Sequence, residues 1–176
     1  MKNDVKRNTL WLCITAMFMG LNVVMSSFGI PVPGGHFYLN DVVICTASIL
    51  LDPLGAFIVG GIGAFLGDFF FYPTPMFVSL VTHGLQAVVI STLTRQLFKS
   101  RPAAGAVIGV IIGAFIMVIG YSFGRAFIYS TPEYAIIKLP YQVLQAVIGA
   151  AGGIILCYCF RLKKIFDDMF KKRINA

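Results

Sequence analysis

The sequence predicts an all-α membrane protein, a six-transmembrane-helix bundle with both termini cytoplasmic. Hydrophobic residues make up 58% of its 176 residues and charged residues only 12%, about half of the roughly 25% that is usual in soluble domains. The mean hydropathy is +0.86. Residues 102–124 include no charged side chain, and about 20 apolar residues are enough for a helix to cross a bilayer. The chain is therefore expected to lie in lipid.

Hydrophobic runs and the breaks between them divide this single integral membrane domain, residues 1–176, into six spans. A Gly/Pro-rich loop follows the first run, Asp52 and Pro53 end the second, and YPTP and TRQLFKSRP close the third and the fourth. Gly and Pro clusters of this kind mark the turns between regular elements. The predicted spans are about residues 8–28, 40–52, 53–72, 76–97, 103–128 and 137–160.

The first run begins like a secretory signal peptide, with Lys6 and Arg7 ahead of an apolar stretch. The stretch continues to Ile30 without a small-residue cleavage site. We therefore expect a retained helix, because a signal peptide has a short apolar region and a cleavage site.

The positions of Lys and Arg orient the predicted bundle, since the cytoplasmic loops of membrane proteins are rich in these residues. With the N-terminus inside, only Arg125 and Lys138 fall on the outside. Attraction of the inside cations to the lipid bilayer accounts for the net charge of +7, so no nucleic-acid partner is expected. The cations assigned to the inside are Lys2, Lys6, Arg7, Arg95, Lys99, Arg101, Arg161, Lys163, Lys164, Lys171, Lys172 and Arg173.

Ionisable residues inside the predicted spans are candidates for function, because a charge in hydrocarbon is costly. Asp68, His83 and Arg125 lie within spans. A structural ion pair between Asp68 and Arg125 is the alternative. Other polar and aromatic candidates lie near them, towards the outer half of the bundle: Gln86, Tyr121, Tyr141, Gln142 and Gln145. They predict an outward-opening pocket with aromatic walls for a small ligand, although an aromatic belt at the membrane surface would also enrich these ends in Tyr and Phe.

The segment GGHFYLND, residues 34–41, concentrates polar side chains at the start of the second span. Its glycines allow a loop to fold tightly over a ligand, and its side chains can cover or contact that ligand. Helix capping is the alternative for the last two polar residues. The candidates in this segment are His36, Phe37, Tyr38, Asn40 and Asp41.

Two small residues of the first span, Ala16 and Gly20, lie four positions apart and therefore on one helix face. Small residues at this spacing let helices approach closely in lipid. This face can pack inside the bundle or dock onto another membrane subunit, and the spacing alone does not decide between them.

Sequence motifs of catalysis are absent from the chain. It has no G-x-x-x-x-G-K-[ST] phosphate loop, no H-E-x-x-H and no G-x-S-x-G. Its four cysteines lie in hydrophobic segments without metal-site spacing. No catalytic residue, cofactor or metal is predicted, and any use of ATP requires a partner. A membrane enzyme with Asp68 and His83 as acid and base is an alternative that lacks a nucleophile motif.

Several segments together resemble the substrate-binding S components of energy-coupling factor (ECF) transporters. The matching features are HFYLND, DP, GGIGAFLGD and FFFYPTP, followed in the last span by LPYQVLQAVIGAAGG, which is similar to the family's Pro-x-(Asn or Gln)-x-x-Gln-Ala-x-x-Gly pattern. Their order and spacing carry the resemblance, which covers residues 10–160.

The resemblance implies a six-helix bundle in the bacterial plasma membrane that captures a vitamin or precursor from outside. It also implies a complex with a transmembrane coupling subunit and two cytoplasmic ATPase subunits, a loop that closes over the ligand, and delivery by toppling in the membrane. In the family, an Ala-x-x-x-Ala element on the first helix docks to the coupling subunit. Ala16 and Gly20 occupy the matching positions here, with Gly in place of the second Ala.

Aromatic walls, amide groups and few charges favour an aromatic-ring ligand such as hydroxymethylpyrimidine or pyridoxine. A riboflavin-type S component remains an alternative. So does a six-span scaffold protein of the cell envelope, which would need a docking surface and no ligand pocket.

Overall fold

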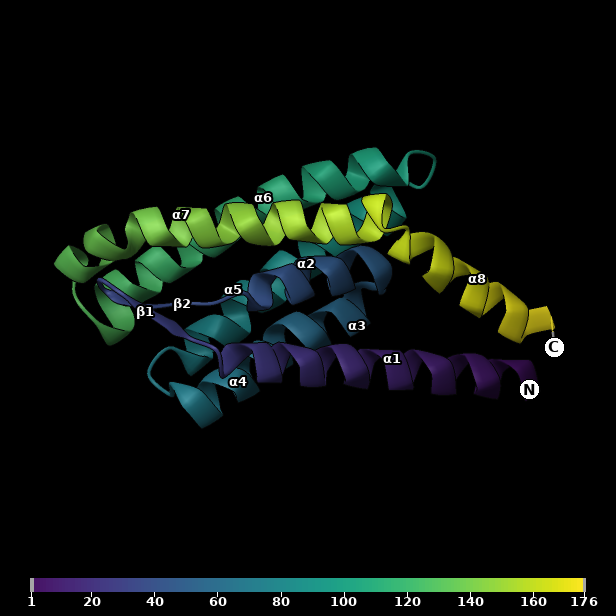
Figure 1. Cartoon of the computed structure of the whole chain (residues 1–176), viewed down its shortest axis with the longest axis horizontal. Coiled ribbons are helices and arrows are strands. Elements are labelled where there is room, and N and C mark those ends of the chain that lie inside the picture. Colours follow the sequence, from purple (N-terminus) through teal and green to yellow (C-terminus); the bar gives the residue numbers. More distant parts are fainter. Residues whose placement is uncertain (1, 176) are drawn as a thin grey trace.

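The computed structural model describes the backbone of residues 2–175 and the side chains of residues 8–171, and nearly all of this chain is helical (Figure 1). The predicted cytoplasmic cations Lys2, Lys6, Arg7, Lys172 and Arg173 lie outside the described side chains. The start of α1 and the end of α8 lie at the same end of the molecule (Figure 1). Which side of the membrane this end faces stays a prediction.

The helices follow one another along the chain with short connections. Helix α1 covers Lys2–Ser26 and α2 covers Asn40–Leu50. Helices α3 (Pro53–Phe57) and α4 (Gly63–Phe71) are joined by a π-helical turn, and α5 (Met76–Thr92), α6 (Pro102–Gly124) and α7 (Pro132–Ile154) each end in such a turn. A last helix, α8, covers Leu162–Asn175. In the described part of the chain, five stretches are long and apolar enough to cross a membrane: 8–26, 53–71, 76–97, 102–129 and 132–159.

Helix α2 is shorter than the five long apolar stretches. Its 11 residues extend about 16 Å at 1.5 Å per residue, whereas the hydrocarbon core is about 30 Å thick. Almost all of its side chains are buried, because it lies against α1, α5 and α7 (Figure 1). The predicted second span is therefore a short central helix enclosed by the long ones, and the count of six crossings stays a prediction.

The loop after α1 contains a small β-hairpin where only an irregular loop was expected. Strand β1 (Ile30–Val32) pairs antiparallel with β2 (Gly35–Phe37), so that Pro31 faces His36. Gly34 and Gly35 have φ of 81° and 145°, values that glycine adopts readily and other residues rarely do. The hairpin lies at the end of the bundle opposite α8 (Figure 1).

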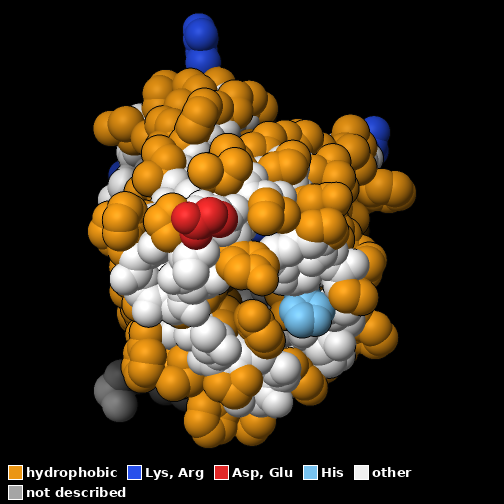
Figure 2. Space-filling model, turned by 90° about the vertical axis from the view of Figure 1, so that its left-hand side faces the viewer, with side chains coloured by type: hydrophobic (Ala, Val, Ile, Leu, Met, Phe, Trp, Pro, Cys, Tyr) orange, Lys and Arg blue, Asp and Glu red, His pale blue; other side chains and the backbone are white. Residues whose placement is uncertain are grey.

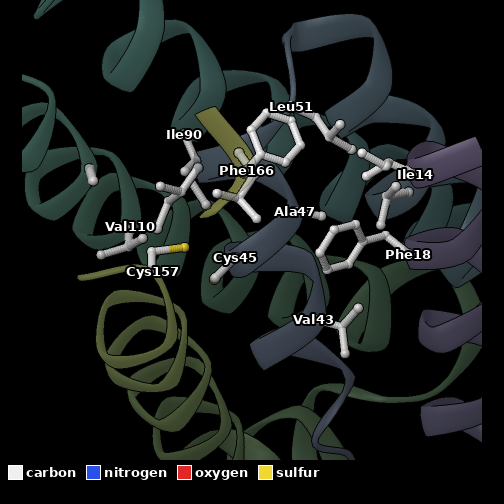
Figure 3. Close-up of a cluster of buried hydrophobic side chains, with 14 residues drawn as sticks. Ile14, Phe18, Val43, Cys45, Ala47, Leu51, Ile90, Val110, Cys157 and Phe166 are labelled. Atoms are coloured by element: carbon white, nitrogen blue, oxygen red, sulfur yellow. The ribbon is translucent and has the colours of Figure 1, made fainter. Parts of the chain in front are cut away.

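The hydrophobic core surrounds α2. Figure 3 shows apolar side chains from α1, α2, α5, α6 and α8 meeting there. Many large apolar side chains elsewhere are exposed, among them Phe115, Ile119 and Ile136. Exposed apolar faces on helices of this length are those that lipid covers. The labelled core residues are Ile14, Phe18, Val43, Cys45, Ala47, Leu51, Ile90, Val110, Cys157 and Phe166.

Glycines allow α2 and α7 to pack in direct backbone contact. A Cβ added at Gly149 would lie 2.5 Å from the Cβ of Asp41, and one added at Gly153 would lie 2.7 Å from that of Cys45. Small residues at a helix interface give this close approach in membranes. Asp41 is thereby held at a fixed distance from α7.

We expect Gly149→Ala to lower the free energy of unfolding by about 1–3 kcal/mol, because the added methyl group overlaps Asp41. The midpoint of thermal unfolding in mild detergent measures the change. Gly20→Ala is the matched control, since a Cβ there meets nothing within 4 Å and alanine favours the helix by about 1 kcal/mol. Equal midpoints for the two variants would contradict the close packing of α2 on α7.

Candidate ligand-binding cavity

A polar cavity of about 40 Å³ lies under the hairpin, in a molecule whose surface at this end shows few charged side chains (Figure 2). Residues from α2, α4, α5, α6 and α7 surround it. Most of the predicted ligand-contacting residues line it: His36, Tyr38, Asn40, Asp68, His83, Tyr121, Arg125, Gln142 and Gln145.

Four predicted residues lie away from the cavity wall. Asp41 and Gln86 are buried directly behind it, each with 1% of its surface exposed. Phe37 and Tyr141 are half-buried, and neither is among the described residues that line the cavity. The structure thus brings together the polar candidates more completely than the aromatic ones.

Asp41 is the centre of a buried hydrogen-bond network that joins three helices. Gln145 Nε2 of α7 donates to Asp41 Oδ2 at 2.6 Å, and Gln86 Nε2 of α5 donates to Asp41 Oδ1 at 3.3 Å. His83 Nδ1 lies 2.7 Å from Gln86 Oε1 and 3.7 Å from Asp41 Oδ1. A buried carboxylate is tolerated when neighbouring donors share its charge in this way. The network fixes the floor of the cavity.

Helix capping does not account for the polar residues at the start of α2. The N-cap of this helix is Leu39, and no side chain caps it. Asn40 instead donates from Nδ2 to Ser26 Oγ of α1 at 3.3 Å, and Asp41 accepts from the two glutamines described above. Both side chains therefore make tertiary contacts.

Asp68 and Arg125 line the same cavity but form no ion pair with each other, so the alternative of a structural pair is wrong. Asp68 Oδ2 accepts a hydrogen bond from Ser79 Oγ, which is also 2.5 Å from the hydroxyl of Tyr121. Arg125 Nη1 donates to Gln142 Oε1 at 3.0 Å, and its guanidinium lies 5.5 Å from the ring centre of Tyr129. Each charge therefore keeps unused hydrogen-bonding capacity towards the cavity.

Two of the cavity-lining residues missed from the sequence have hydrogen-bonding side chains, Lys138 and Tyr72. Lys138 was assigned to the outside, at the very start of the predicted span 137–160, but α7 begins at Pro132 and carries this lysine inside the helix with 2% of its surface exposed. Its ammonium group donates to the backbone oxygen of His36. The Pro-Glu pair at 132–133 is a helix-start signal that could have placed it.

The hairpin is tied to the cavity floor through Gln145. The backbone N–H of Tyr38 donates to Gln145 Oε1 at 3.2 Å, while the amide nitrogen of Gln145 donates to Asp41. Burial raises the pKa of the Tyr38 phenol, and the nearby Asp68 carboxylate raises it further. The phenol therefore stays protonated at neutral pH and keeps its donor.

Two buried polar atoms at the cavity wall have no protein partner. They are Nδ1 of His36 and Oδ1 of Asn40. A buried polar atom without a partner costs roughly 1–3 kcal/mol, and such atoms at a cavity wall mark positions where a bound molecule can supply the missing hydrogen bond. The imidazole of His36 also packs edge-on against the Tyr72 ring, with centres 5.1 Å apart.

Ala16 and Gly20 lie on the exposed face of α1 and therefore do not pack inside the bundle. A Cβ at Gly20 would meet no atom within 4 Å. Next to them, Leu12, Met17 and Val24 are also exposed. The small residues thus interrupt an apolar surface that is otherwise made of large side chains.

A model of the family described as ECF-type riboflavin transporter, S component, matches residues 6–163. The chain belongs to this family. The match covers nearly the whole bundle, from α1 to the start of α8, and it confirms the resemblance drawn from the motifs. The chain is therefore the substrate-binding subunit of an ECF-type membrane transporter. No protein with curated annotation matches it.

In this S component, Gln145→Leu should remove both the acceptor of the Tyr38 amide and a donor to the buried Asp41 carboxylate. We expect unfolding to become easier by about 1–3 kcal/mol and the Tyr38 amide to exchange its hydrogen faster. Thermal unfolding and hydrogen-exchange mass spectrometry measure the two effects. Gln96→Leu, at an exposed glutamine, is the control, and unchanged exchange at Tyr38 in Gln145→Leu would show that Gln145 does not hold the hairpin.

Proposed function

We propose that this S component captures a small, flat heteroaromatic vitamin or precursor, of the size of hydroxymethylpyrimidine or pyridoxine, from outside a bacterial cell. The ligand binds in the cavity under the hairpin. A transmembrane coupling subunit and two cytoplasmic ATPase subunits then use ATP to deliver it inward. The S component itself catalyses no reaction.

The unpartnered polar atoms at the cavity wall carry this proposal. His36 Nδ1 and Asn40 Oδ1 have no protein partner, although polar groups enclosed in a bundle are nearly always paired. The aromatic rings of Tyr72 and Tyr121 lie edge-on to His36 and His83, at 5.1 and 5.2 Å between centres. Flat rings beside directed polar groups suit a flat heteroaromatic ligand.

Size favours a one-ring ligand. The cavity of about 40 Å³ is much smaller than the roughly 300–1,000 Å³ of a typical ligand pocket. Any vitamin must therefore displace the hairpin or the wall side chains to enter. A single ring demands less displacement than a tricyclic one does.

Riboflavin is the second candidate, because the description of the matching family names it. Its three fused rings and ribityl chain would need the cavity to open much further. The two candidates differ enough in mass to be distinguished directly.

Mass spectrometry of small molecules released from the purified, detergent-solubilised protein tests the proposal. We expect one stoichiometric heteroaromatic compound, retained by the wild type and lost from Asp68→Asn. Asp168→Asn, at an exposed carboxylate of α8, is the matched control and should retain it. If no compound is released and no vitamin raises the unfolding temperature, the proposed capture of a heteroaromatic vitamin is wrong.

Docking to the coupling subunit is proposed for the exposed face around Ala16 and Gly20. We expect Ala16→Trp to leave ligand affinity unchanged, because this face lies outside the bundle, and to abolish uptake in cells that contain the whole transporter. Ala104→Trp, at an exposed alanine of α6, is the control. Weakened ligand binding by Ala16→Trp, or uptake equal to that of the control, would contradict docking at this face.

A further inference from the structure

The cavity holds two cations whose hydrogen-bonding capacity is mostly unused. Arg125 donates one hydrogen bond, to Gln142, and Lys138 donates one, to the backbone of His36. A guanidinium has five N–H donors and an ammonium has three. Both side chains are nearly buried, with 8% and 2% of their surfaces exposed. Buried cations require acceptors, and no acidic side chain in the described part of the chain pairs with either.

The two cations lie together beneath the turn of the hairpin. A Cβ at Gly34 would lie 3.0 Å from the Cβ of Lys138, and a Cβ at Gly35 would lie 3.6 Å from Nη2 of Arg125. The hairpin turn thus covers both side chains, and both line the cavity, where an acceptor can reach them. This wall of the cavity is a donor wall.

A second wall of the cavity consists of acceptors. It includes the Asp68 carboxylate, whose Oδ2 alone is engaged, and the unpartnered Oδ1 of Asn40. Ser26 of α1 lies next to both residues. Its hydroxyl accepts a hydrogen bond from Asn40, and it packs against Gly67, the neighbour of Asp68, where an added Cβ would be 2.5 Å from Ser26 Oγ. Asn40 and Asp68 therefore line the cavity from α2 and α4, next to Ser26 of α1, whereas Arg125 and Lys138 line it from the turn after α6 and from α7.

We infer that the cavity selects a flat, net-neutral ligand with hydrogen-bond acceptors on the edge that faces Arg125 and Lys138 and hydrogen-bond donors on the edge that faces Asn40 and Asp68. This inference rests on the proposed function and specifies the chemistry of its ligand. The ligand lies between the two walls and forms hydrogen bonds with the charged groups of both. Lys138 and Asp68 are then residues that determine specificity as well as affinity.

The sum of charges supports a neutral ligand. With Asp41 directly behind the wall, the formal charges of Asp41, Asp68, Arg125 and Lys138 cancel. A phosphate ester would bring about two negative charges into an enclosed site that offers no net positive charge. Two carboxylates nearby would then repel it, which is how a site rejects a competitor as well as binding its own ligand.

The test compares three net-neutral compounds with their phosphate esters, using isothermal titration of the purified full chain in detergent. The compounds are hydroxymethylpyrimidine, pyridoxine and riboflavin. We expect at least one to bind, with an affinity at least about tenfold above that of its own ester, since one charged hydrogen bond is worth about a factor of ten. Lys138→Met and Asp68→Asn should each lower the affinity for the neutral compound by about tenfold.

The two variants should change the ratio of the affinity for the neutral compound to the affinity for its ester in opposite directions. A merely structural role would not do this. Asp68→Asn removes a negative charge that repels the ester and should lower this ratio. Lys138→Met removes a positive charge and should raise it. The matched controls are Asp168→Asn and Lys163→Met, on α8 and far from the cavity (Figure 1), and neither should change affinity.

The outcomes separate the inference from the proposed function. If a neutral compound binds but its ester binds as well or better, or if both variants shift the preference in the same direction, the inference is wrong and the proposed function stands. If an ester alone binds, the inference is equally wrong. If none of the six compounds binds, the proposed function and the inference fail together.

Discussion

Hydrocarbon offers no hydrogen-bond partners, so each polar group inside this bundle must be satisfied by the protein or by a ligand. Asp41 shows how the protein meets this constraint. Its carboxylate is shared between Gln86 of α5 and Gln145 of α7, and Gln145 extends the network to the backbone of Tyr38. The position of α2, the floor of the cavity and the seat of the hairpin all depend on this one buried carboxylate.

Close packing and polar pairing support each other around α2. The glycines of α7 bring its backbone against Asp41 and Cys45, which places Gln145 within hydrogen-bonding distance of the carboxylate. Without the small residues the helices would stand further apart, and Asp41 would lose a donor. Because α2 is short and enclosed, it can serve as a fixed central support while the longer helices face lipid.

Hydropathy was sufficient to predict the helical membrane class, since long apolar runs have few alternatives in lipid. The short motifs predicted the family. Periodicity could assign residues to helix faces, but not which helix each face meets. A structural pair of Asp68 with Arg125 therefore stayed open as an alternative, whereas Asp68 meets Ser79. Lys138 was placed at the outer edge of its span because α7 begins earlier than its hydrophobic run does. The hairpin was missed because two strands of three residues leave almost no alternating pattern.

The cavity and the small-residue face of α1 use different parts of the molecule. Ala16 and Gly20 lie on the outer surface of the bundle, while the residues that line the cavity lie within it beneath the hairpin. We therefore expect substitutions in one region to leave the chemistry of the other unchanged. A protein built in this way can acquire a new ligand preference through substitutions of a few wall residues while its outer face stays constant.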